Sequence, residues 1–373
     1  MKIGFDAKRL FNNFTGLGNY SRSLVKDLIR LEKSARFYLY TPKLKENNET
    51  KIFINENKFL LRSSKKMFWR VKGVIKDLKQ DGVELYHGLS NEIPFGINKS
   101  GIKSVVTIHD LIFNIYPKTY NFFDSKIYNI KFKYACKNAD KIIAISESTK
   151  NDIVRFYNVS PLKVEVIYQA CNPLFYELQS KDSVASILNK YSLPQNFMLY
   201  VGSIIERKNL LTIVKAQEKL NNYLRIPLVI VGKGGAYKNK VQEYIKMKGL
   251  SDHFIWLDNL SDNYHLQAFY QAAEVFIYPS VYEGFGIPVV EALLSKTPVI
   301  TSNLSSLPEA GGPDSVCIDP TDVDAMVKSI ENILSDEEFR SEIVERGYNY
   351  ARSNFDSDVC ANKVLDLYHK VIN

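Results

Sequence analysis

Short apolar runs alternate with longer amphipathic segments along the first 167 residues. Runs rich in Val, Ile, Phe and Tyr predict buried strands at residues 2–5, 37–40, 83–87, 104–109, 142–145 and 164–167. Helical spacing of apolar residues predicts helices at residues 20–31, 65–79, 122–137 and 147–156. Because buried strands that alternate with helices form parallel sheets with helices on both faces, we expect an α/β domain here.

The same alternation returns after residue 196. It predicts strands at residues 197–201, 227–231, 254–257, 275–278, 298–301 and 316–318. Helices are predicted at residues 210–221, 237–247, 264–273 and 289–295, and the tail from residue 322 reads as helical. Residues 170–196 contain two prolines and no clear strand, which is typical of a linker region.

The length of 373 residues exceeds what one ordinary core accommodates. We therefore predict two Rossmann-like α/β domains with parallel sheets, at residues 1–175 and 176–355. Their facing edges are expected to form a central cleft, because ligands of such sheets bind beyond the carboxyl ends of the strands.

Composition is that of a globular protein, with 45% hydrophobic and 24% charged residues. No run of about 18 apolar residues is present, and the first residues lack the apolar segment of a signal peptide, so we expect a cytoplasmic protein. Four widely spaced cysteines, with no C-x-x-C pair, favour buried free thiols over a zinc site or a disulfide framework.

Positive charge is concentrated in one segment. The chain has a net charge of +8, and residues 58–79 hold eight Lys and Arg against one Asp. A local anionic partner is expected for this basic segment: a membrane surface, a phosphorylated acceptor or nucleic acid. Apolar residues at helical spacing favour packing of one face on the sheet, while Phe59, Leu60, Phe68 and Trp69 suit a membrane interface.

Three glycine-containing turns follow predicted strands and could bind phosphate. Residues 13–22, "NFTGLGNYSR", open a helix with Gly16 and Gly18, but they match neither G-x-G-x-x-G nor a Walker loop. Residues 202–209, "GSIIERKN", place Arg207 and Lys208 before a helix, where adjacent cations are unfavourable unless an anion binds. The third turn is "VGKGG" at residues 231–235. Plain turns and solvated surface charges remain the alternatives.

Two glutamates flank a glycine-rich turn in "YEGFGIPVVEAL", residues 282–293. Seven residues separate Glu283 from Glu291. A retaining glycosidase would need its two carboxylates about 5 Å apart, and a metal site would need further ligands nearby. The D-x-D pairs at residues 322–324 and 356–358 are better explained as helix caps and first-turn acids.

The position of each glutamate favours ligand binding. Pro288 suits a first helical turn, so Glu291 lies inside a helix with its side chain leaning toward the N-terminus. From there a carboxylate can accept hydrogen bonds from the vicinal hydroxyls of a ribose. Glu283, on the preceding loop, could do the same for a sugar, with a diphosphate between them. No metal ion is expected.

These residues resemble the family 4 retaining glycosyltransferases of the GT-B fold. "EGFGIPVVE" is supported by "GLGNYSR", "TIHDL" (107–111), "ADKIIAISES" (139–148), "GSIIERKN" and "TSNLSSLPE" (301–309), which span most of the chain. Within the family, the combination looks most like bacterial mannosyltransferases of surface-polysaccharide assembly. The resemblance implies a metal-independent hexosyltransferase without a cofactor, and a C-terminal helix at about 356–373 that packs back on the first domain.

The resemblance also implies a role for each matching residue. Arg207 and Lys208 would hold the donor diphosphate, Glu291 the ribose and Glu283 the donor sugar, while His109 would lie beside the reacting centre. The predicted catalytic set is thus His109, Arg207, Lys208 and Glu283. The remaining predicted donor-binding residues line loops: Gly16, Leu17, Gly18, Gly202, Ser203, Gly232, Leu260, Gly284, Phe285, Gly286 and Ile287, with the nucleobase near Gly232 and residues 257–260.

The expected substrates are a nucleotide sugar, with GDP-mannose favoured, and a glycan or lipid-linked acceptor. A UDP-sugar donor, a GT-B-fold epimerase or phosphorylase-like enzyme, and a catalytically silent sugar-nucleotide binder are the alternatives. A nucleic-acid binder that uses residues 58–79 is the alternative of another class, and no motif supports it. We expect the basic segment to attach the protein to the inner face of the cytoplasmic membrane.

Overall fold

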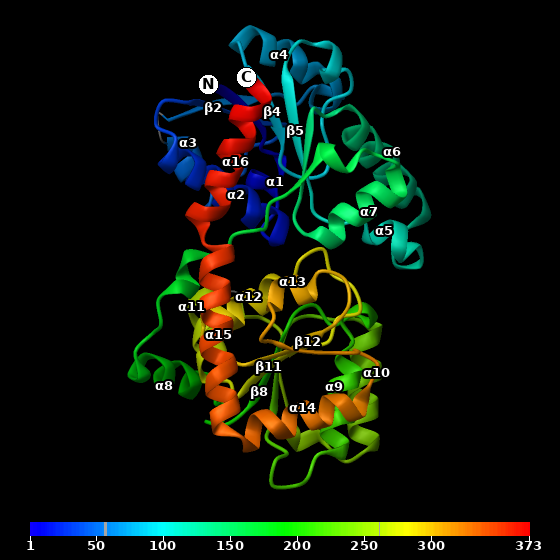
Figure 1. Cartoon of the computed structure of the whole chain (residues 1–373), viewed down its shortest axis with the longest axis vertical. Coiled ribbons are helices and arrows are strands. Elements are labelled where there is room, and N and C mark those ends of the chain that lie inside the picture. The colour runs from blue at the N-terminus through cyan, green and yellow to red at the C-terminus, as the bar shows by residue number, and fades with distance from the viewer. Residues whose placement is uncertain (56–57, 261) are drawn as a thin grey trace. The chain divides into compact units, whose positions relative to one another are not determined.

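The computed structural model describes residues 1–55, 58–260 and 262–373 (Figure 1). The chain forms two compact units, one of Met1–Ala170 with Ser357–Asn373 and one of Cys171–Asp356. The boundary therefore lies five residues before the expected one. Its cause is local: the Cys171 N–H donates to the Phe355 carbonyl at 3.2 Å, and Gln267 donates to the Leu174 carbonyl at 2.8 Å, which ties this segment to the second unit.

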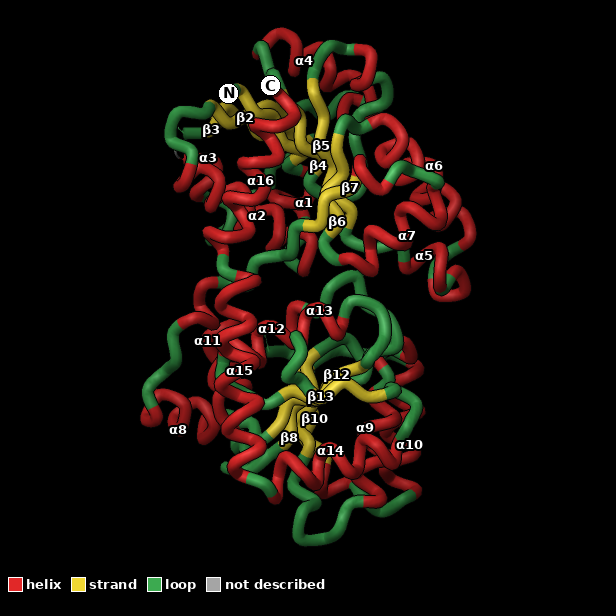
Figure 2. Tube along the Cα trace, in the orientation of Figure 1, coloured by secondary structure: helices red, strands yellow, loops and turns green. Residues whose placement is uncertain are grey.

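Unit 1 contains a seven-stranded, wholly parallel sheet (Figure 2). Its strands lie in the order β3-β2-β1-β4-β5-β6-β7. Their bounds are β1 Lys2–Asp6, β2 Arg36–Thr41, β3 Phe59–Ser63, β4 Leu85–Gly88, β5 Lys103–Ile108, β6 Lys141–Ala144 and β7 Val164–Val166.

Strand β3 was not predicted. It is an edge strand, so Leu60 and Arg62 are exposed and the segment lacks the continuous apolar pattern of its neighbours. The predicted helix at 65–79 is also shorter than expected. Phe68 has φ of 59°, a left-handed conformation that interrupts the predicted helix. A π-helical turn, η1 (Trp69–Gly73), follows it, and the α-helix α4 spans only Val74–Asp81.

Helices cover both faces of the first sheet. One core joins the sheet to α2 and α16, and the other joins it to α4, α6 and α7. The bounds are α1 Lys8–Asn12, α2 Gly16–Leu31, α3 Ile52–Asn55, α5 Ile112–Ile115, α6 Phe122–Asn138, α7 Glu147–Tyr157 and α16 Ser357–Ile372. Helix α16 thus places the C-terminal segment on unit 1, beside α2.

Unit 2 contains a six-stranded parallel sheet in the order β10-β9-β8-β11-β12-β13. All six strands were predicted to within one residue; the central ones, such as β9 and β11, are continuous buried apolar runs. Their bounds are β8 Met198–Val201, β9 Leu228–Val231, β10 Phe254–Leu257, β11 Val275–Tyr278, β12 Val299–Ser302 and β13 Val316–Ile318.

Helices α9, α10 and α14 share a core with one face of this sheet, whereas α11 packs against Phe276 from the other and contacts α12. The bounds are α8 Lys181–Lys190, α9 Leu210–Lys219, α10 Ala236–Met247, α11 Asn263–Ala272, α12 Ile287–Leu294, α13 Leu307–Gly311, α14 Val323–Ser335 and α15 Glu337–Phe355. Helix α8 lies in the segment interpreted as a linker. Its Ser180 cap, which accepts from the Ser183 N–H, is a start signal that the prolines obscured.

Each sheet has one place where the strand order reverses. In unit 1 the reversal lies between β1 and β4, and in unit 2 it lies between β8 and β11. Loops leave the carboxyl ends of these adjacent strands in opposite directions and open a crevice, which is where open parallel sheets bind ligands. The residues that follow these four strands are therefore the candidate ligand-binding residues.

Candidate active site

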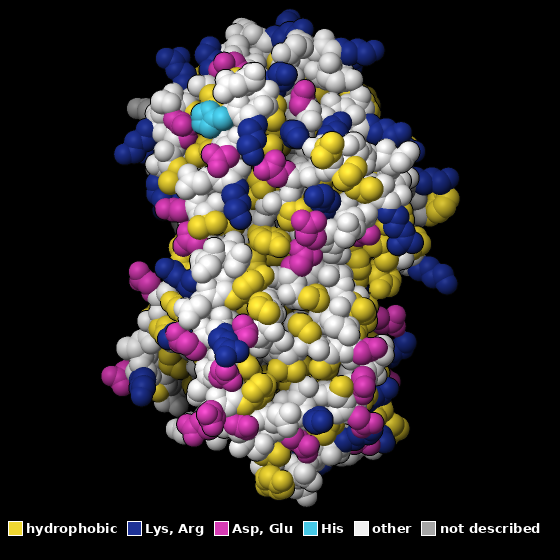
Figure 3. Space-filling model, viewed as in Figure 1, with side chains coloured by type: hydrophobic (Ala, Val, Ile, Leu, Met, Phe, Trp, Pro, Cys, Tyr) yellow, Lys and Arg dark blue, Asp and Glu magenta, His cyan; other side chains and the backbone are white. Residues whose placement is uncertain are grey.

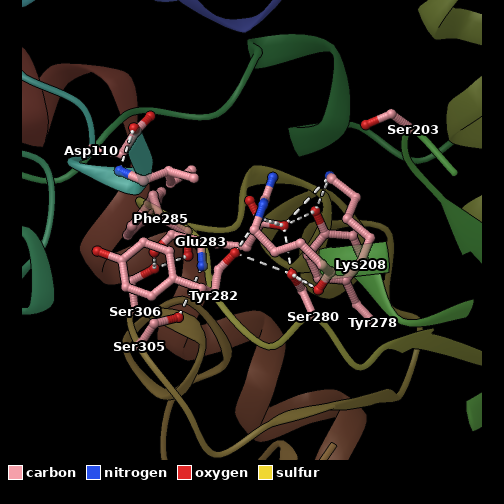
Figure 4. Close-up of polar contacts among 12 residues, drawn as sticks. Asp110, Ser203, Lys208, Tyr278, Ser280, Tyr282, Glu283, Phe285, Ser305 and Ser306 are labelled. Carbon is pink, nitrogen blue, oxygen red and sulfur yellow. Dashed lines mark hydrogen bonds and ion pairs between the residues drawn. The ribbon is translucent and has the colours of Figure 1, made fainter. Parts of the chain in front are cut away.

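The residues that follow β8 and β11 form a charged cluster in unit 2 (Figure 4). Arg207 and Lys208 lie in a 3₁₀ turn, η6 (Glu206–Lys208), directly before α9. Glu283 follows β11 by five residues. Its Oε1 lies 2.8 Å from Arg207 Nη1 and 3.6 Å from Lys208 Nζ. The structure thus brings together the three residues of unit 2 that the sequence assigned to chemistry.

The Glu283 carboxylate is almost completely enclosed by donors. The hydroxyls of Tyr278 and Ser280 donate to it at 3.1 and 2.8 Å, and its side chain is 12% exposed. Burial alone would raise the pKa of Glu283, but the charges of Lys208 and Arg207 outweigh burial and hold that pKa below its usual range. Burial lowers the pKa of Lys208. The cluster holds two cations against one anion, an excess of one positive charge.

Two serines fix the turn between the glutamates. Ser305 Oγ accepts from the Glu283 N–H at 3.0 Å, and Ser306 Oγ donates to the carbonyls of Glu283 and Phe285 at 2.9 and 2.7 Å. Gly286 has φ of 124°, and a Cβ there would lie 2.8 Å from Leu307, so only glycine fits before α12. The turn is therefore held by the start of α13 as well as by its own sequence.

Glu291 lies one turn inside α12, as its sequence position predicted. Burial raises its pKa to about 7, and the Tyr270 hydroxyl, which donates to Oε2 at 3.1 Å, offsets this only in part. A carboxylate with one protein donor and an unfavourable desolvation is ready to accept further hydrogen bonds. Vicinal hydroxyls would supply two.

Glycines line the carboxyl ends of β8 and β9. A Cβ on Gly232 would lie 1.9 Å from the Gly202 carbonyl oxygen, and both residues have φ near 150°. The Gly232 N–H donates to the Leu257 carbonyl at 3.1 Å, so this backbone is set by β10. Ser203 is exposed and Leu260 is partly buried. The absence of side chains at Gly202 and Gly232 leaves backbone exposed at this edge, and its role beside the nucleobase stays a prediction.

In unit 1, the two glycines of the loop at the start of α2, Gly16 and Gly18, have different surroundings. A Cβ on Gly18 would lie 1.7 Å from the Asn13 carbonyl oxygen, whereas a Cβ on Gly16 would meet no described atom within 4 Å. Asn13 Oδ1 accepts from the Gly18 N–H at 3.1 Å, and Arg22 donates to the Leu10 and Asn13 carbonyls. Gly18 is therefore required by the fold, and Gly16 leaves open space at the start of α2.

His109 follows β5 and is 3% exposed. Its Nε2 lies 3.0 Å from the Leu89 carbonyl and its Nδ1 lies 2.8 Å from Gln169 Nε2, which assigns the proton to Nε2. Burial lowers the pKa of His109 to about 4, the Leu89 hydrogen bond opposes this, and the charge of Arg9 adds to it. The imidazole is neutral, and both nitrogens are engaged. It is built to hold a position rather than to exchange a proton at neutral pH.

Several supporting residues were not predicted. Tyr270, Tyr278, Ser280, Ser305 and Ser306 bond to the glutamate turn, and only the "TSNLSSLPE" motif signalled any of them. The two aromatic hydroxyls were hidden among apolar residues of α11 and β11. Gly16, Leu17, Gly18 and His109 belong to unit 1, whereas the other predicted site residues belong to unit 2.

Among residues 1–55, 58–260 and 262–373, no three His, Cys, Asp or Glu side chains are grouped so that they could hold a metal ion. Asp322 caps α14 by accepting from the Ala325 N–H, and Asp358 pairs with Arg30. Asp324 and Asp358 lie in the first turns of α14 and α16, as expected, whereas the expected cap by Asp356 stays a prediction.

The two units match two family models. Residues 14–173 match the model described as Glycosyltransferase Family 4, and residues 187–350 match the model described as Glycosyl transferases group 1. The chain is 28% identical over 389 aligned residues to O-antigen chain mannosyltransferase B of Escherichia coli, covering 99% of both chains. It is 29% identical to O-antigen chain mannosyltransferase RfbU of Salmonella typhimurium, covering 68% of this chain and 66% of RfbU.

Solved structures show the same fold. A glycosyltransferase from Rickettsia africae superposes with a TM-score of 0.78 at 18% identity, covering 100% of this chain and 98% of that one. Anabaena Alr3699/HepE, in complex with UDP, gives 0.77 at 14% identity, covering 99% and 100%. The two-sheet architecture expected from the resemblance is thus that of known glycosyltransferases.

Proposed function

We propose, from the premise that the chain belongs to the glycosyltransferases described by these two family models, that it transfers a hexose from a nucleotide sugar to a glycan or lipid-linked acceptor with retention of anomeric configuration. The supporting observation is the Arg207–Lys208–Glu283 cluster at the strand reversal of unit 2. Two buried cations that share one carboxylate form a site for a diphosphate.

The donor would lie along the glutamate turn. Glu291 accepts the ribose hydroxyls, Arg207 and Lys208 face the diphosphate, and Glu283 orients the sugar through its hydroxyls. Glu283 keeps the two cations in place, at 2.8 and 3.6 Å. A diphosphate that enters compensates their charge and frees part of the carboxylate for the sugar. The cations are therefore preorganised, which is what transition-state stabilisation requires.

Transfer breaks the bond between the anomeric carbon and the diphosphate oxygen. The acceptor hydroxyl adds to the same face of that carbon, and its proton passes to the departing phosphate oxygen. Negative charge develops on the leaving diphosphate, where Arg207 and Lys208 lie. Their fixed charges replace those a metal ion would supply, so the proposed reaction is metal-independent. His109 of unit 1 is neutral and both of its ring nitrogens are hydrogen-bonded, so it is not proposed to donate or accept a proton.

Mannose is the proposed sugar and GDP-mannose the proposed donor. The support is the names of the Escherichia coli and Salmonella relatives, which are mannosyltransferases of O-antigen chains. The proposed acceptor is accordingly a growing surface polysaccharide. A panel of GDP-mannose, GDP, UDP-glucose and UDP should show thermal stabilisation by the guanine nucleotides above that by the uracil nucleotides. Preferential stabilisation by UDP-glucose would instead indicate a UDP-sugar donor and contradict GDP-mannose.

A membrane attachment at residues 58–79 is proposed in a revised form. Trp69 and Phe59 are 6% and 9% exposed and belong to the core, so they were wrongly assigned to an interface. Leu60, Met67 and Phe68 are 51–82% exposed. Arg62 pairs with Asp81, and Arg70 with Asp6 and Glu92, but five lysines of the segment point outward: Lys65, Lys66, Lys72, Lys76 and Lys79. Figure 3 shows dark-blue side chains around the part of unit 1 where Figure 1 labels α4.

The exposed apolar residues amid lysines suit the headgroup region of an anionic membrane at the cytoplasmic face. None of the helices in the described ranges is long and apolar enough to span a bilayer. Replacement of Met67 and Phe68 by Ser should weaken sedimentation with anionic liposomes at low salt. Replacement of Phe122 and Phe123, equally exposed on α6 at 64% and 74%, is the matched control. If only the replacement of Phe122 and Phe123 abolished liposome binding, the membrane-binding surface would be α6 and not residues 58–79.

A further inference from the structure

Buried polar side chains cross the apolar core that joins the first sheet to helices α2 and α16. Thr107 lies on β5, His87 on the neighbouring β4 and Tyr368 on α16, and all three are fully buried. Side chains alternate along a strand, so Thr107 faces the same core as Val105. A threonine there fills nearly the space of a valine but buries a hydroxyl, which is unfavourable unless the hydroxyl is hydrogen-bonded.

Hydrogen bonds connect these side chains to one another and to α2. His87 Nδ1 lies 2.5 Å from the Tyr368 hydroxyl, and His87 Nε2 lies 2.8 Å from Thr107 Oγ1. Thr107 Oγ1 lies in turn 3.0 Å from the hydroxyl of Tyr20, near the start of α2. Burial lowers the pKa of His87 to about 3, so its imidazole is neutral. Either tautomer keeps both bonds, because a hydroxyl can donate or accept. We call these four residues the buried polar network.

The network ends against His109. The rings of Tyr20 and His109 are in edge contact, with centroids 4.7 Å apart and planes at 86°. The Leu89 carbonyl and Gln169 hold the two ring nitrogens of His109. Contact with Tyr20 limits the rotation about the line between those nitrogens, which the two hydrogen bonds leave free. The Tyr20 ring is itself fixed, because its hydroxyl is bonded to Thr107.

We propose that the buried polar network positions the imidazole of His109 for transfer, so that helix α16 acts on the reacting centre through Tyr368 without touching a substrate. The inference rests on the proposed transferase function, in which His109 lies beside the reacting centre. A role in stability alone would explain the network less well. Buried hydrogen bonds add only about 1 kcal/mol each, and apolar residues of the same shape often replace such groups without loss.

Substitutions at Thr107 separate positioning from stability. Thr107→Val keeps the shape and removes the hydroxyl, whereas Thr107→Ser keeps the hydroxyl and removes a methyl group. Thr107→Val should lower kcat and kcat/KM roughly three- to tenfold at an unchanged donor KM, as expected for a lost hydrogen bond that acts only at the transition state. Thr107→Ser should turn over at nearly the wild-type rate. If the network served stability alone, both variants would keep the wild-type kcat per nucleotide-binding site, measured well below their melting temperatures.

Tyr368→Phe tests the far end of the network, and decides the matter if Thr107→Val does not fold. It removes the hydroxyl bonded to His87 and should lower kcat roughly threefold at an unchanged donor KM. Tyr40→Phe is the matched control and should behave as wild type. It removes another buried hydroxyl of unit 1, bonded to Asp81 at 2.7 Å in the core on the other face of the sheet. A wild-type rate in Thr107→Val or in Tyr368→Phe would overturn the proposal.

Nuclear magnetic resonance gives a readout that does not depend on transfer. The Tyr20 ring, 4.7 Å away, shifts the resonances of the His109 ring protons by its ring current, so these resonances report on the contact. With the five histidines labelled and His109→Asn used for assignment, the His109 signals should move in Thr107→Val and Tyr368→Phe. They should stay in place in Tyr40→Phe.

The two readouts separate failure of the network from failure of the proposed function. Unmoved His109 signals in Thr107→Val would overturn the positioning role even if that variant were slow. If the wild type transferred no sugar from any nucleotide donor, the proposed function would fail, and the His109 signals would still decide whether the network holds the imidazole.

Discussion

Glu283 has two roles, one structural and one proposed for the ligand, and the sequence motif alone does not distinguish them. Its carboxylate compensates Arg207 and Lys208 in the ligand-free state, and it is proposed to orient the donor sugar. The motifs predicted that all three residues bind the donor, the cations at its diphosphate and Glu283 at its sugar. It did not predict that they bond to one another, since side-chain direction at the ends of loops depends on neighbours such as Tyr278 and Ser280.

Lys208→Ala should lower kcat/KM by roughly 10²–10³ through loss of charge stabilisation on the leaving diphosphate. The melting temperature should change little, because removal of a buried ammonium also removes its desolvation cost and its repulsion by Arg207. Steady-state kinetics and a thermal melt measure both. Transfer at the wild-type rate would contradict the assignment.

Glu283→Ala is expected to affect stability as well as activity. Arg207 and Lys208, 13% and 12% exposed, would lose their carboxylate, at a cost of about 3 kcal/mol. Glu283→Gln keeps an acceptor for Tyr278 and Ser280 and should unfold closer to wild type, while transfer stays impaired. Chemical denaturation compares the two. If Glu283→Ala proved as stable as wild type, the ion pair would not be a structural element.

Glu291 makes donor binding dependent on pH. Its pKa of about 7 means that the carboxylate, which is proposed to accept the ribose hydroxyls, is lost as pH falls through 7. We expect the Kd for the nucleoside diphosphate to rise between pH 8 and pH 6. Glu291→Gln should bind weakly and lose this dependence. A Kd independent of pH in the wild type would show that Glu291 does not contact the ligand.

The same raised pKa has the opposite effect on folding. A carboxyl whose folded pKa exceeds its unfolded value contributes stability below about pH 4.5, and that stability is lost as pH rises through 7. Glu291→Gln should therefore raise the melting temperature of the ligand-free protein at pH 8. The ionised, buried carboxylate of Glu291 would therefore lower the stability of the folded protein, while the same carboxylate is proposed to contact the ligand. A lower melting temperature at pH 8 would indicate a structural role instead.

At the level of elements, the strands of the second sheet were predictable because buried parallel strands are continuous apolar runs. Strand β3 was not, since an exposed edge needs no such run. Helix α8 was hidden by the prolines around it. The glycine turns were located correctly, but only the structure shows which glycines the fold itself requires.

The start of α2 offers a matched pair of glycine substitutions. Gly18→Ala should destabilise the loop, because its Cβ would meet the Asn13 carbonyl at 1.7 Å. Gly16→Ala should fold normally, because nothing described lies near its Cβ, and should raise the donor KM if a phosphate approaches there. Thermal melts and kinetics measure both. Unchanged KM in Gly16→Ala would remove this loop from the donor site.

For the whole molecule, the two-unit organisation followed from length and from the repeated alternation of strands and helices. The boundary at 170/171 did not, because it depends on two long-range hydrogen bonds: the Cys171 N–H donates to the Phe355 carbonyl, and the Gln267 side chain donates to the Leu174 carbonyl. Nor could the sequence show where each sheet reverses its strand order.

Metal independence concerns the whole reaction. Arg207 and Lys208 are proposed to supply the charge that a divalent ion would bring to the diphosphate. Treatment with EDTA, followed by assay in metal-free buffer, should leave transfer within about twofold of the untreated rate, a difference too small to reflect the loss of a catalytic charge. Loss of activity that Mg²⁺ or Mn²⁺ restores would contradict this.

A nucleoside diphosphate is proposed to bind at the strand reversal of unit 2, on Arg207 and Lys208. Isothermal titration calorimetry of GDP and UDP with the wild type and Lys208→Ala tests it most directly. We predict binding of at least one nucleotide by the wild type and an affinity lower by roughly tenfold or more in the variant. Equal affinity of wild type and variant for that nucleotide would contradict the account.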